Sequence, residues 1–249
     1  MRICHLTSVH SYKDTRIFIK ECQTLANAGF EVHLIAPNAP DKVIKNVNIH
    51  GIQSQKGNRI KRMTKTVNLV YRRALKINAM IYHFHDPELI PVGLKLKKKG
   101  KIVIYDVHED VPKQILTKTW IPKFLRRPLS WFIEKYENKK SQNFDVIVTA
   151  TEFIKERFLE NKCNAFDIKN YPLLEELKSE NKKWSDKGNY VCYIGGISYL
   201  RGINEMVRAV NLSNSNIQLL LGGNFVSSVD KENVKEIGMG KSKRIRISG

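Results

Sequence analysis

Two short turns near the middle of the chain each place a histidine beside a carboxylate. His85 and Asp86 close the apolar run IYHF, and His108 and Glu109 close the run KIVIYDV. Histidine exchanges protons near neutral pH, and a neighbouring carboxylate can orient it or stabilise a developing positive charge. Both turns are therefore candidates for acid–base chemistry or for contacts with a polar substrate, although His85 and Asp86 can equally stabilise their own turn with Pro87.

The segments around these turns have to bring them together. Residues 81–84 and 101–106 have the apolar pattern of strands, and residues 88–99 between them have the length and spacing of a helix. A parallel strand–helix–strand unit places both turns at the carboxyl ends of the strands, where open α/β sheets bind their ligands. We therefore expect the two turns to face one cleft.

The first part of the chain shows the same alternation. Residues 2–7 and 31–36 are expected to be strands, residues 14–28 form the helix between them, and residues 144–150 are a further buried strand. Strands that alternate with helices from the start of a chain indicate a doubly wound parallel sheet. The fold class is therefore predicted as α/β.

The loop after the first strand limits the possible functions. Residues 8–13 contain no glycine, so the dinucleotide-binding fingerprint G-x-G-x-x-G is absent and a nicotinamide or flavin enzyme is disfavoured. Asp14 and Arg16 open the helix that follows. They are either a capping acid and a surface base or two groups that contact an acceptor.

The composition indicates anionic partners and a reducing compartment. The net charge of +19 and the pI near 9.8 suit a membrane surface, nucleic acid or a phosphorylated small molecule. Four cysteines without C-x-x-C spacing predict neither a zinc site nor a disulfide framework, and they favour small core residues in a cytoplasmic protein. Because no apolar run approaches about 18 residues and the chain opens on a strand, neither a membrane span nor a secretory leader is expected.

Residues 113–141 combine basic and aromatic side chains. Eight Lys or Arg residues stand against two Glu residues there. The interleaved aromatic residues are Trp120, Phe124, Trp131, Phe132 and Tyr136. Amphipathic helices at a membrane surface have this composition, which predicts peripheral contact with anionic lipid. The alternative is that the aromatic residues pack into the core and the charges form a solvated face.

A change of composition divides the chain. The polar run of residues 175–188 indicates a connection between two domains. We therefore expect an N-terminal domain of residues 1–170, a connection of residues 171–188 and a second domain of residues 189–249.

The second domain repeats the order of strand, loop and helix. Two predicted strands end in glycine pairs, Gly195-Gly196 and Gly222-Gly223, and Arg201 stands at the start of the helix. Glycines at such a turn let backbone N–H groups approach a phosphate, whose charge the helix N-terminus favours. The turns therefore predict phosphate binding, with a purely structural tight turn as the alternative.

Four stretches together resemble the retaining, nucleotide-sugar-dependent glycosyltransferases of the GT-B fold, often called group 1 glycosyltransferases. They begin RICHLTSVHSYKD, YHFHDPELIPVG, DVIVTATEFIKERF and YIGGISYLRG, and they span nearly all of the chain to about residue 225. The resemblance implies two Rossmann-like domains, of which the N-terminal one receives the acceptor and the C-terminal one holds the nucleotide-sugar. It also implies transfer without a bound metal or a separate cofactor.

The resemblance assigns expected roles to individual residues. His108 falls where the family keeps a histidine near the reacting sugar, and this makes it the expected catalytic residue. Arg201 keeps the charge of the lysine in the family motif G-R-L-x-x-x-K-G and is expected to pair with the diphosphate, whereas Gly196 stands where arginine is common. The expected acceptor-side residues are Asp14, Arg16, His85, Asp86 and Glu109, and the expected donor-side residues are Gly195, Gly196, Arg201, Gly222 and Gly223.

One family feature is missing from this sequence. In the family the acidic donor-binding motif, E-x7-E, lies well beyond the glycine turn at Gly222, and residues 229–249 contain no such acidic pair, so the donor domain is expected to be incomplete. A truncated reading frame and a split enzyme with a partner chain are both open explanations. The 249-residue polypeptide alone is expected to transfer sugar poorly or not at all.

The expected function is that of a cytoplasmic, peripherally membrane-associated glycosyltransferase of surface polysaccharide or glycolipid assembly. Its partners would be a nucleotide-sugar and a saccharide or lipid-linked acceptor. One alternative is a nucleotide-sugar epimerase of the same architecture, and another is a non-catalytic or split-enzyme subunit that supplies the acceptor-binding half to a partner chain. Nucleic-acid binding would rest on charge alone, because the sequence carries no RNP, KH or helix-turn-helix pattern.

Overall fold

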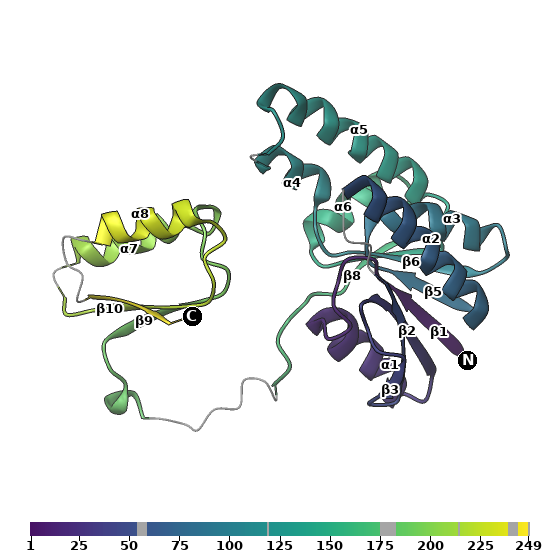
Figure 1. The fold of residues 1–249 in the computed structure, drawn as a ribbon, viewed down its shortest axis with the longest axis horizontal. Helices are drawn as coiled ribbons and strands as arrows, with labels where there is room; N and C mark the ends of the chain where they lie inside the picture. The colour runs from purple at the N-terminus through teal and green to yellow at the C-terminus, as the bar shows by residue number, and fades with distance from the viewer. Residues whose placement is uncertain (54–58, 119, 175–182, 214, 239–243, 249) are drawn as a thin grey trace. The chain divides into compact units, whose positions relative to one another are not determined.

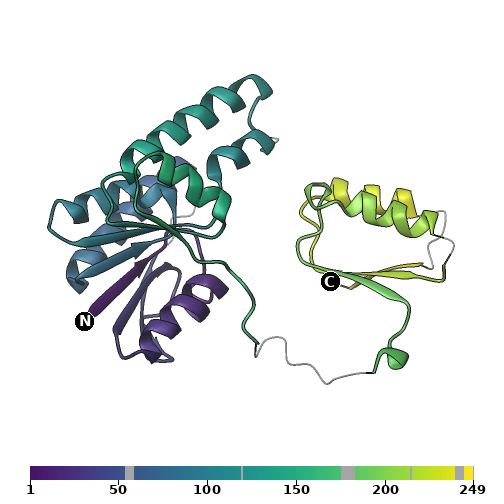
Figure 2. The same cartoon turned by 180° about the vertical axis from the view of Figure 1, so that it is seen from behind.

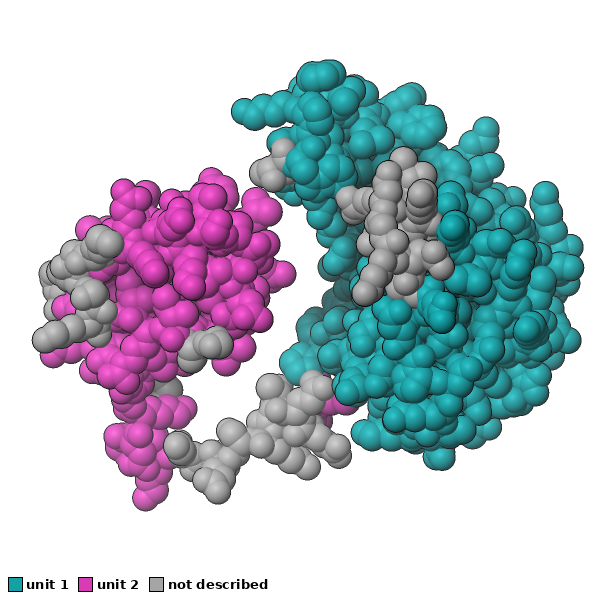
Figure 3. All heavy atoms as spheres, in the orientation of Figure 1, with its two compact units in different colours: residues 1–172 teal, residues 173–249 magenta. Residues whose placement is uncertain are grey.

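The computed structural model describes residues 1–53, 59–118, 120–174, 183–213, 215–238 and 244–248. The chain forms two compact units, residues 1–172 and residues 173–249, which Figure 3 colours separately. The expected end of the first domain, residue 170, lies two residues before this division. Much of the expected connection, residues 175–182, lies outside the described residues.

The described part of the first unit is built on an eight-stranded sheet of order β3-β4-β2-β1-β5-β6-β7-β8 (Figure 1). The strands are β1 Arg2–Leu6, β2 Glu31–Pro37, β3 Lys42–Ile44, β4 Val47–Ile52, β5 Ile81–Phe84, β6 Ile102–Val107, β7 Val146–Thr149 and β8 Ala165–Asp167. All neighbours pair in parallel except β3 and β4. The strand order reverses direction between β1 and β5, and ligands bind at such a switch point in open α/β sheets.

Helices cover both faces of this sheet. They are the π-helix η1 Thr15–Cys22, α1 Gln23–Asn27, α2 Arg59–Ile77, the 3-10 helix η2 Pro87–Leu89, α3 Ile90–Lys97, α4 Val111–Thr117, α5 Lys123–Ser141 and α6 Glu152–Glu160. The single helix expected over residues 14–28 is thus divided into a π-helical and an α-helical part. Asp14 caps η1 by accepting hydrogen bonds from the backbone N–H groups of Arg16 and Ile17, and Thr151 caps α6 in the same way.

Two apolar cores lie on opposite faces of the first sheet. One contains Leu6 and Phe84 and is closed by α2, α3 and α6, and the other contains Ile17 and Phe18 of η1 packed against β2 and β4. Successive side chains of a strand point to opposite faces. Since Leu6 and Phe84 enter the first core, the preceding residues of β1 and β5 point toward η1, and both of these residues are histidines.

The described residues of the second unit contain a three-stranded parallel sheet of order β11-β10-β9. Its elements are the 3-10 helix η4 Trp184–Asp186, β9 Tyr190–Ile194, the 3-10 helix η5 Tyr199–Arg201, α7 Ile203–Leu212, β10 Gln218–Gly222, α8 Ser228–Gly238 and β11 Ile245–Ser248. Both α7 and α8 lie on one face of the sheet, as Figures 1 and 2 show from opposite sides. The molecule is therefore α/β in both units, as predicted.

The composition led to two expectations, one about the burial of the cysteines and one about membrane-spanning helices. Cys4, Cys22 and Cys163 are buried, as predicted for small core residues, whereas Cys192 is exposed on β9, so the prediction was wrong for that residue. Cys192 is exposed because α7 and α8 cover only the other face of its sheet. Among the described residues, no helix is long and apolar enough to cross a membrane.

Candidate functional site

The loops that follow β1, β5 and β6 meet at the carboxyl edge of the first sheet. Asp86, directly after β5, is buried and its Oδ2 accepts hydrogen bonds from Thr7 Oγ1 at 2.8 Å and from the backbone N–H of Ser8 at 2.6 Å. Asp86 makes no side-chain cap to the turn that follows it. Its carboxylate therefore links the loop after β1 to the loop after β5. The alternative in which Asp86 stabilises its own turn did not include this link.

His10, in the loop after β1, lies between two carboxylates. Its Nδ1 lies 3.6 Å from Asp14 Oδ2 and its Nε2 lies 3.3 Å from Asp86 Oδ1. The carboxylates of Asp14 and then of Asp86 raise the pKa of His10 to about 10, and the contact with His10 lowers the pKa of Asp14 to about 2. His10 is thus a cation held between two carboxylates at neutral pH.

His108, the predicted catalytic residue, lies beside His10. The two Nε2 atoms are 3.1 Å apart, and the rings meet edge to face with centroids 4.9 Å apart. Side-chain exposure is 27% for His10 and 17% for His108, whereas His85 and Asp86 behind them are buried. The accessible part of the site is therefore the His10–His108 pair.

Asp106, at the end of β6, lies behind this pair and was missed by the sequence interpretation. Its Oδ2 accepts a hydrogen bond from His85 Nδ1 at 3.0 Å and lies 3.7 Å from His108 Nδ1. Burial alone would raise the pKa of Asp106, but His108, His85 and Arg16 hold it well below its ordinary value. Asp106 is therefore a buried anion that orients the imidazoles of both predicted turns.

Arg16 neutralises this buried anion. Its guanidinium is buried and donates to both Asp106 oxygens, at 2.8 and 2.7 Å, and to the backbone carbonyl of Ile168 at 2.9 Å. The alternative of a surface base was wrong, because the shape of η1 turns Arg16 inward. Its expected contact with the acceptor stays a prediction, and the same holds for Asp14 and for the exposed Glu109, whose side chain accepts from Gln114 instead of joining this group.

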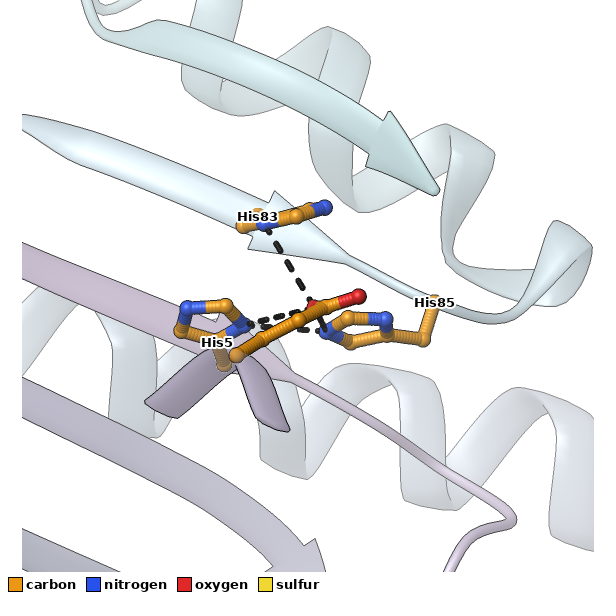
Figure 4. Close-up of side chains that lie close together, drawn as sticks. His5, His83 and His85 are labelled. Atoms are coloured by element: carbon orange, nitrogen blue, oxygen red, sulfur yellow. Dashed lines mark hydrogen bonds and ion pairs between the residues drawn. The ribbon is translucent and has the colours of Figure 1, made fainter. Parts of the chain in front are cut away.

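A second cluster lies deeper, between η1 and the sheet (Figure 4). His5 of β1, His83 of β5 and His85 surround the carboxylate of Glu21 from η1, and Glu21 Oε2 is 3.7, 3.9 and 3.8 Å from their nearest nitrogens. Burial and then the neighbouring His85 lower the pKa of His83 to about 3. Burial also lowers the pKa of His5, and burial together with Asp106 raises that of Glu21.

The sequence carried a signal for this cluster that was not used. His83 lies on β5 and His85 follows the strand two residues later, so the alternation of side chains predicts that both point to the same side. His5 lies in register with His83 on the adjacent β1. Although no metal site was expected, two groups in the described residues have donor atoms within 4.8 Å of one another. One consists of His5, Glu21, His83 and His85, and the other of His85, Asp106 and His108.

The predicted donor residues lie in the second unit, at the carboxyl ends of β9 and β10. The backbone N–H of Gly195 donates to the carbonyl of Gly222 at 2.9 Å, so the two glycine turns are adjacent. Gly223 has φ +131°, and a Cβ there would collide with the backbone of Gly195. Arg201 is exposed at the end of η5, two residues before α7. A Cβ added at Gly196 would make only ordinary contact with Val226.

Comparison with known proteins gives the chain a family. Residues 16–168 match Glycosyltransferase Family 4. The chain is similar in structure to sucrose-phosphate synthase from Thermosynechococcus elongatus, with a TM-score of 0.67 and 18% identity over 100% of this chain and 70% of that chain. A search of curated proteins gave no match.

Two further solved structures have the same architecture. A protein from Anabaena in complex with UDP and glucose has a TM-score of 0.67 and 12% identity over 100% of this chain and 69% of that chain. The apo form of a lipopolysaccharide outer core galactosyltransferase has a TM-score of 0.60 and 15% identity over 100% of this chain and 68% of that chain. These similarities show the GT-B fold of glycosyltransferases, and the sequence match covers more than half of the chain. The chain belongs to Glycosyltransferase Family 4.

Proposed function

We propose that this protein transfers a sugar, with retention of configuration, from a nucleotide-sugar to a saccharide or lipid-linked acceptor in surface polysaccharide or glycolipid assembly. The observation that carries the proposal is the His10–His108 pair, which lies accessible at the carboxyl edge of the first sheet with Asp106 and Asp86 behind it. This edge is the ligand-binding edge of open α/β sheets. Two similar structures support it, since one holds UDP and glucose and the other is a lipopolysaccharide outer core galactosyltransferase.

His108 is the proposed catalytic residue. Sugar transfer passes through an oxocarbenium-like state, whose positive charge is stabilised by nearby hydrogen-bond acceptors and anions. The protonated His10 donates to His108, and the anionic Asp106 lies on the other side of the His108 ring. In the proposal the ring of His108 lies against the transferred sugar at this edge, and His10 and Asp106, which approach its two nitrogens, keep the ring in place.

The donor diphosphate is proposed to bind at the paired glycine turns of the second unit. The positive φ of Gly195 and Gly223 turns their backbone groups away from the strand direction, and Arg201, six residues after Gly195, supplies a positive charge. Departure of a nucleoside diphosphate develops negative charge, which such donors stabilise without a metal ion. We propose transfer by this metal-independent route.

A membrane-facing acceptor is supported by the surface of α5. Its buried residues are polar, namely Ser130, Glu137, Asn138 and Ser141. Its aromatic residues face outward, with Phe124 78% exposed and Trp131 and Phe132 each 62% exposed. The alternative in which these aromatic residues fill the core was therefore wrong. Exposed aromatic rings among lysines and arginines suit the headgroup region of an anionic bilayer, and we propose peripheral binding there.

A panel of nucleotide-sugars tests the proposed function. Purified protein is incubated with each donor and with vesicles that carry a lipid-linked saccharide, and released nucleoside diphosphate and labelled product are measured. We expect release with at least one donor, strong loss in His108→Ala and little change in His50→Gln, which lies on β4. Equal rates in wild type and His108→Ala would remove His108 from the proposal.

The second unit favours a second candidate, a subunit that works with a partner chain. The face of its sheet not covered by α7 and α8 exposes Tyr190 at 47% and Ile194 at 85%, and exposed apolar strand residues suit an interface. Size-exclusion chromatography with light scattering tests this candidate. A monomer that transfers sugar alone, unchanged by Ile194→Ser, would contradict it.

A further inference from the structure

Four ligand-type side chains converge on one buried point between η1 and the sheet. His5 and His83 come from adjacent strands, His85 follows β5, and Glu21 reaches them from η1 (Figure 4). The three histidines are buried. An apolar packing contact would be expected where a helix lies on a sheet, so this position is unusual for four ionisable groups.

We propose that His5, Glu21, His83 and His85 bind one Zn²⁺ ion in a closed tetrahedral site that fastens η1 to β1 and β5. Three imidazoles and one carboxylate are ligands that zinc accepts. Mg²⁺ and Ca²⁺ take oxygen ligands, so a set with three nitrogen donors disfavours them. The site is separate from sugar transfer, in which the metal has no part.

The distances between the donor atoms suit a tetrahedral ion. Zinc bonds of about 2.0–2.1 Å place neighbouring donor atoms about 3.3–3.4 Å apart in a tetrahedron. The corresponding distances are 3.0 Å from His5 Nδ1 to His85 Nε2, and 3.7, 3.8 and 3.9 Å from Glu21 Oε2 to His5, His85 and His83. These four distances lie within about 0.6 Å of the tetrahedral value, and all donor atoms of the group lie within 4.8 Å of one another.

The surrounding residues already orient two of the ligands. Asp106 Oδ2 accepts from His85 Nδ1 at 3.0 Å, which leaves the lone pair of His85 Nε2 directed at the cluster. Arg16 Nε lies 3.2 Å from Glu21 Oε1, which leaves Glu21 Oε2 directed at the three imidazoles. A carboxylate behind a ligating histidine is the usual outer arrangement of protein zinc sites.

Glu21 Oε2 points into the cluster without a hydrogen bond of its own. It is buried, and it has no hydrogen-bond partner among the described residues. A buried carboxylate oxygen without a donor is costly, and a bound cation removes that cost. The other candidate group, with His108, is less suitable because His85 Nδ1 already donates its proton to Asp106.

The π-helical form of η1 makes this arrangement possible. Arg16 and Glu21 are five residues apart in η1. In a π-helix a backbone N–H bonds to the carbonyl five residues earlier, as Ile19 N does to Asp14 O, and this spacing turns both side chains toward the sheet. By tying Glu21 to β1 and β5, zinc would fix the end of η1 against the sheet.

Metal analysis of the full 249-residue chain tests the proposal. Protein dialysed against chelator is titrated with Zn²⁺, and bound metal is measured after gel filtration, together with the melting temperature. We expect one Zn²⁺ per chain in wild type, with a higher melting temperature than in the metal-free protein. Less than a tenth of that content is expected in Glu21→Gln and His83→Gln.

His50→Gln is the matched control. It removes a histidine from the pair in which His33 Nδ1 lies 2.8 Å from His50 Nε2 on the same sheet, and this pair belongs to neither of the two groups of metal-binding donors. We expect this variant to keep one equivalent of Zn²⁺. Loss of zinc in His50→Gln, or full retention in Glu21→Gln and His83→Gln, would overturn the proposal.

A spectroscopic measurement on wild type covers the case in which the variants do not fold. Co²⁺ is added to the metal-free protein, and the visible absorption and the X-ray absorption edge are recorded. We expect the intense visible bands of a tetrahedral site and a first shell of nitrogen and oxygen with imidazole scattering. A weak octahedral spectrum, or no bound metal, would contradict the proposed site.

Discussion

Arg16 and Asp106 form a bidentate ion pair between η1 and β6, with Arg16 Nε 2.8 Å from Asp106 Oδ2 and Arg16 Nη2 2.7 Å from Asp106 Oδ1. Both side chains are buried. The pair connects the deep histidine cluster to the accessible edge, because Asp106 also contacts His85 and approaches His108. The geometry of the candidate site therefore depends on this one pair.

Arg16→Met is expected to lower the free energy of unfolding by about 3–5 kcal/mol, because Asp106 would remain buried without its partner. Urea denaturation followed by circular dichroism measures this change. Arg2→Met is the control, since the Arg2–Glu31 pair is 42% and 47% exposed and an exposed ion pair contributes little to stability. Equal losses in the two variants would contradict the role given to Arg16.

The stability should fall on the alkaline side because of His10. Its pKa is raised from 6.5 to about 10, so the protonated form is favoured in the folded state. The resulting stabilisation is complete below pH 6.5 and is lost as the pH rises through about 10. The urea midpoint of wild type is therefore expected to drop over this range more than that of His10→Gln. An NMR titration that places the pKa of His10 near 6.5 would refute this.

Membrane binding should depend on the outward face of α5. Trp131→Ser with Phe132→Ser is expected to lower binding to anionic vesicles about tenfold or more, because each ring would otherwise bury apolar surface at the interface. The melting temperature should not fall, since both side chains are 62% exposed. Vesicle sedimentation measures the effect, with Phe166→Ser on β8 as the control. Unchanged vesicle binding in the double variant would contradict the proposed membrane contact of α5.

Gly223 should be sensitive to a single added carbon atom. Gly223→Ala is expected to abolish nucleotide-sugar binding, because φ is +131° and the new Cβ would meet the backbone of Gly195. Gly196→Ala adds the same atom in ordinary contact with Val226 and should bind within about threefold of wild type. Isothermal titration calorimetry compares the two. Equal affinity would show that the glycine turns do not form the donor site.

The sequence predicted the strands and their shared edge well, for a physical reason. Apolar runs between turns predicted the bounds of β1, β2, β5 and β9 to within one or two residues. The right-handed connection of parallel strands then predicted that the turns after β5 and β6 lie together. The short β8 was not predicted, because three residues carry too little pattern. The position of His108 at the edge followed from topology alone.

Other features depend on packing that local patterns do not record. Helical spacing in α5 did not reveal which face is buried, since Glu137 is held inside by Tyr105 at 2.6 Å and Arg157 at 2.8 Å while the aromatic residues face outward. The inward turn of Arg16 and Glu21 required a π-helix, which ordinary α-helical periodicity cannot predict.

The most direct test of the proposed transfer measures nucleoside diphosphate release from a nucleotide-sugar by wild type and His108→Ala in the presence of acceptor vesicles. Because the comparison is between variants, even slow release is sufficient. We predict release by wild type, about 10²-fold less in His108→Ala at an unchanged melting temperature, and wild-type release in His50→Gln. Release that is the same in His108→Ala and wild type would contradict the role of His108 in sugar transfer.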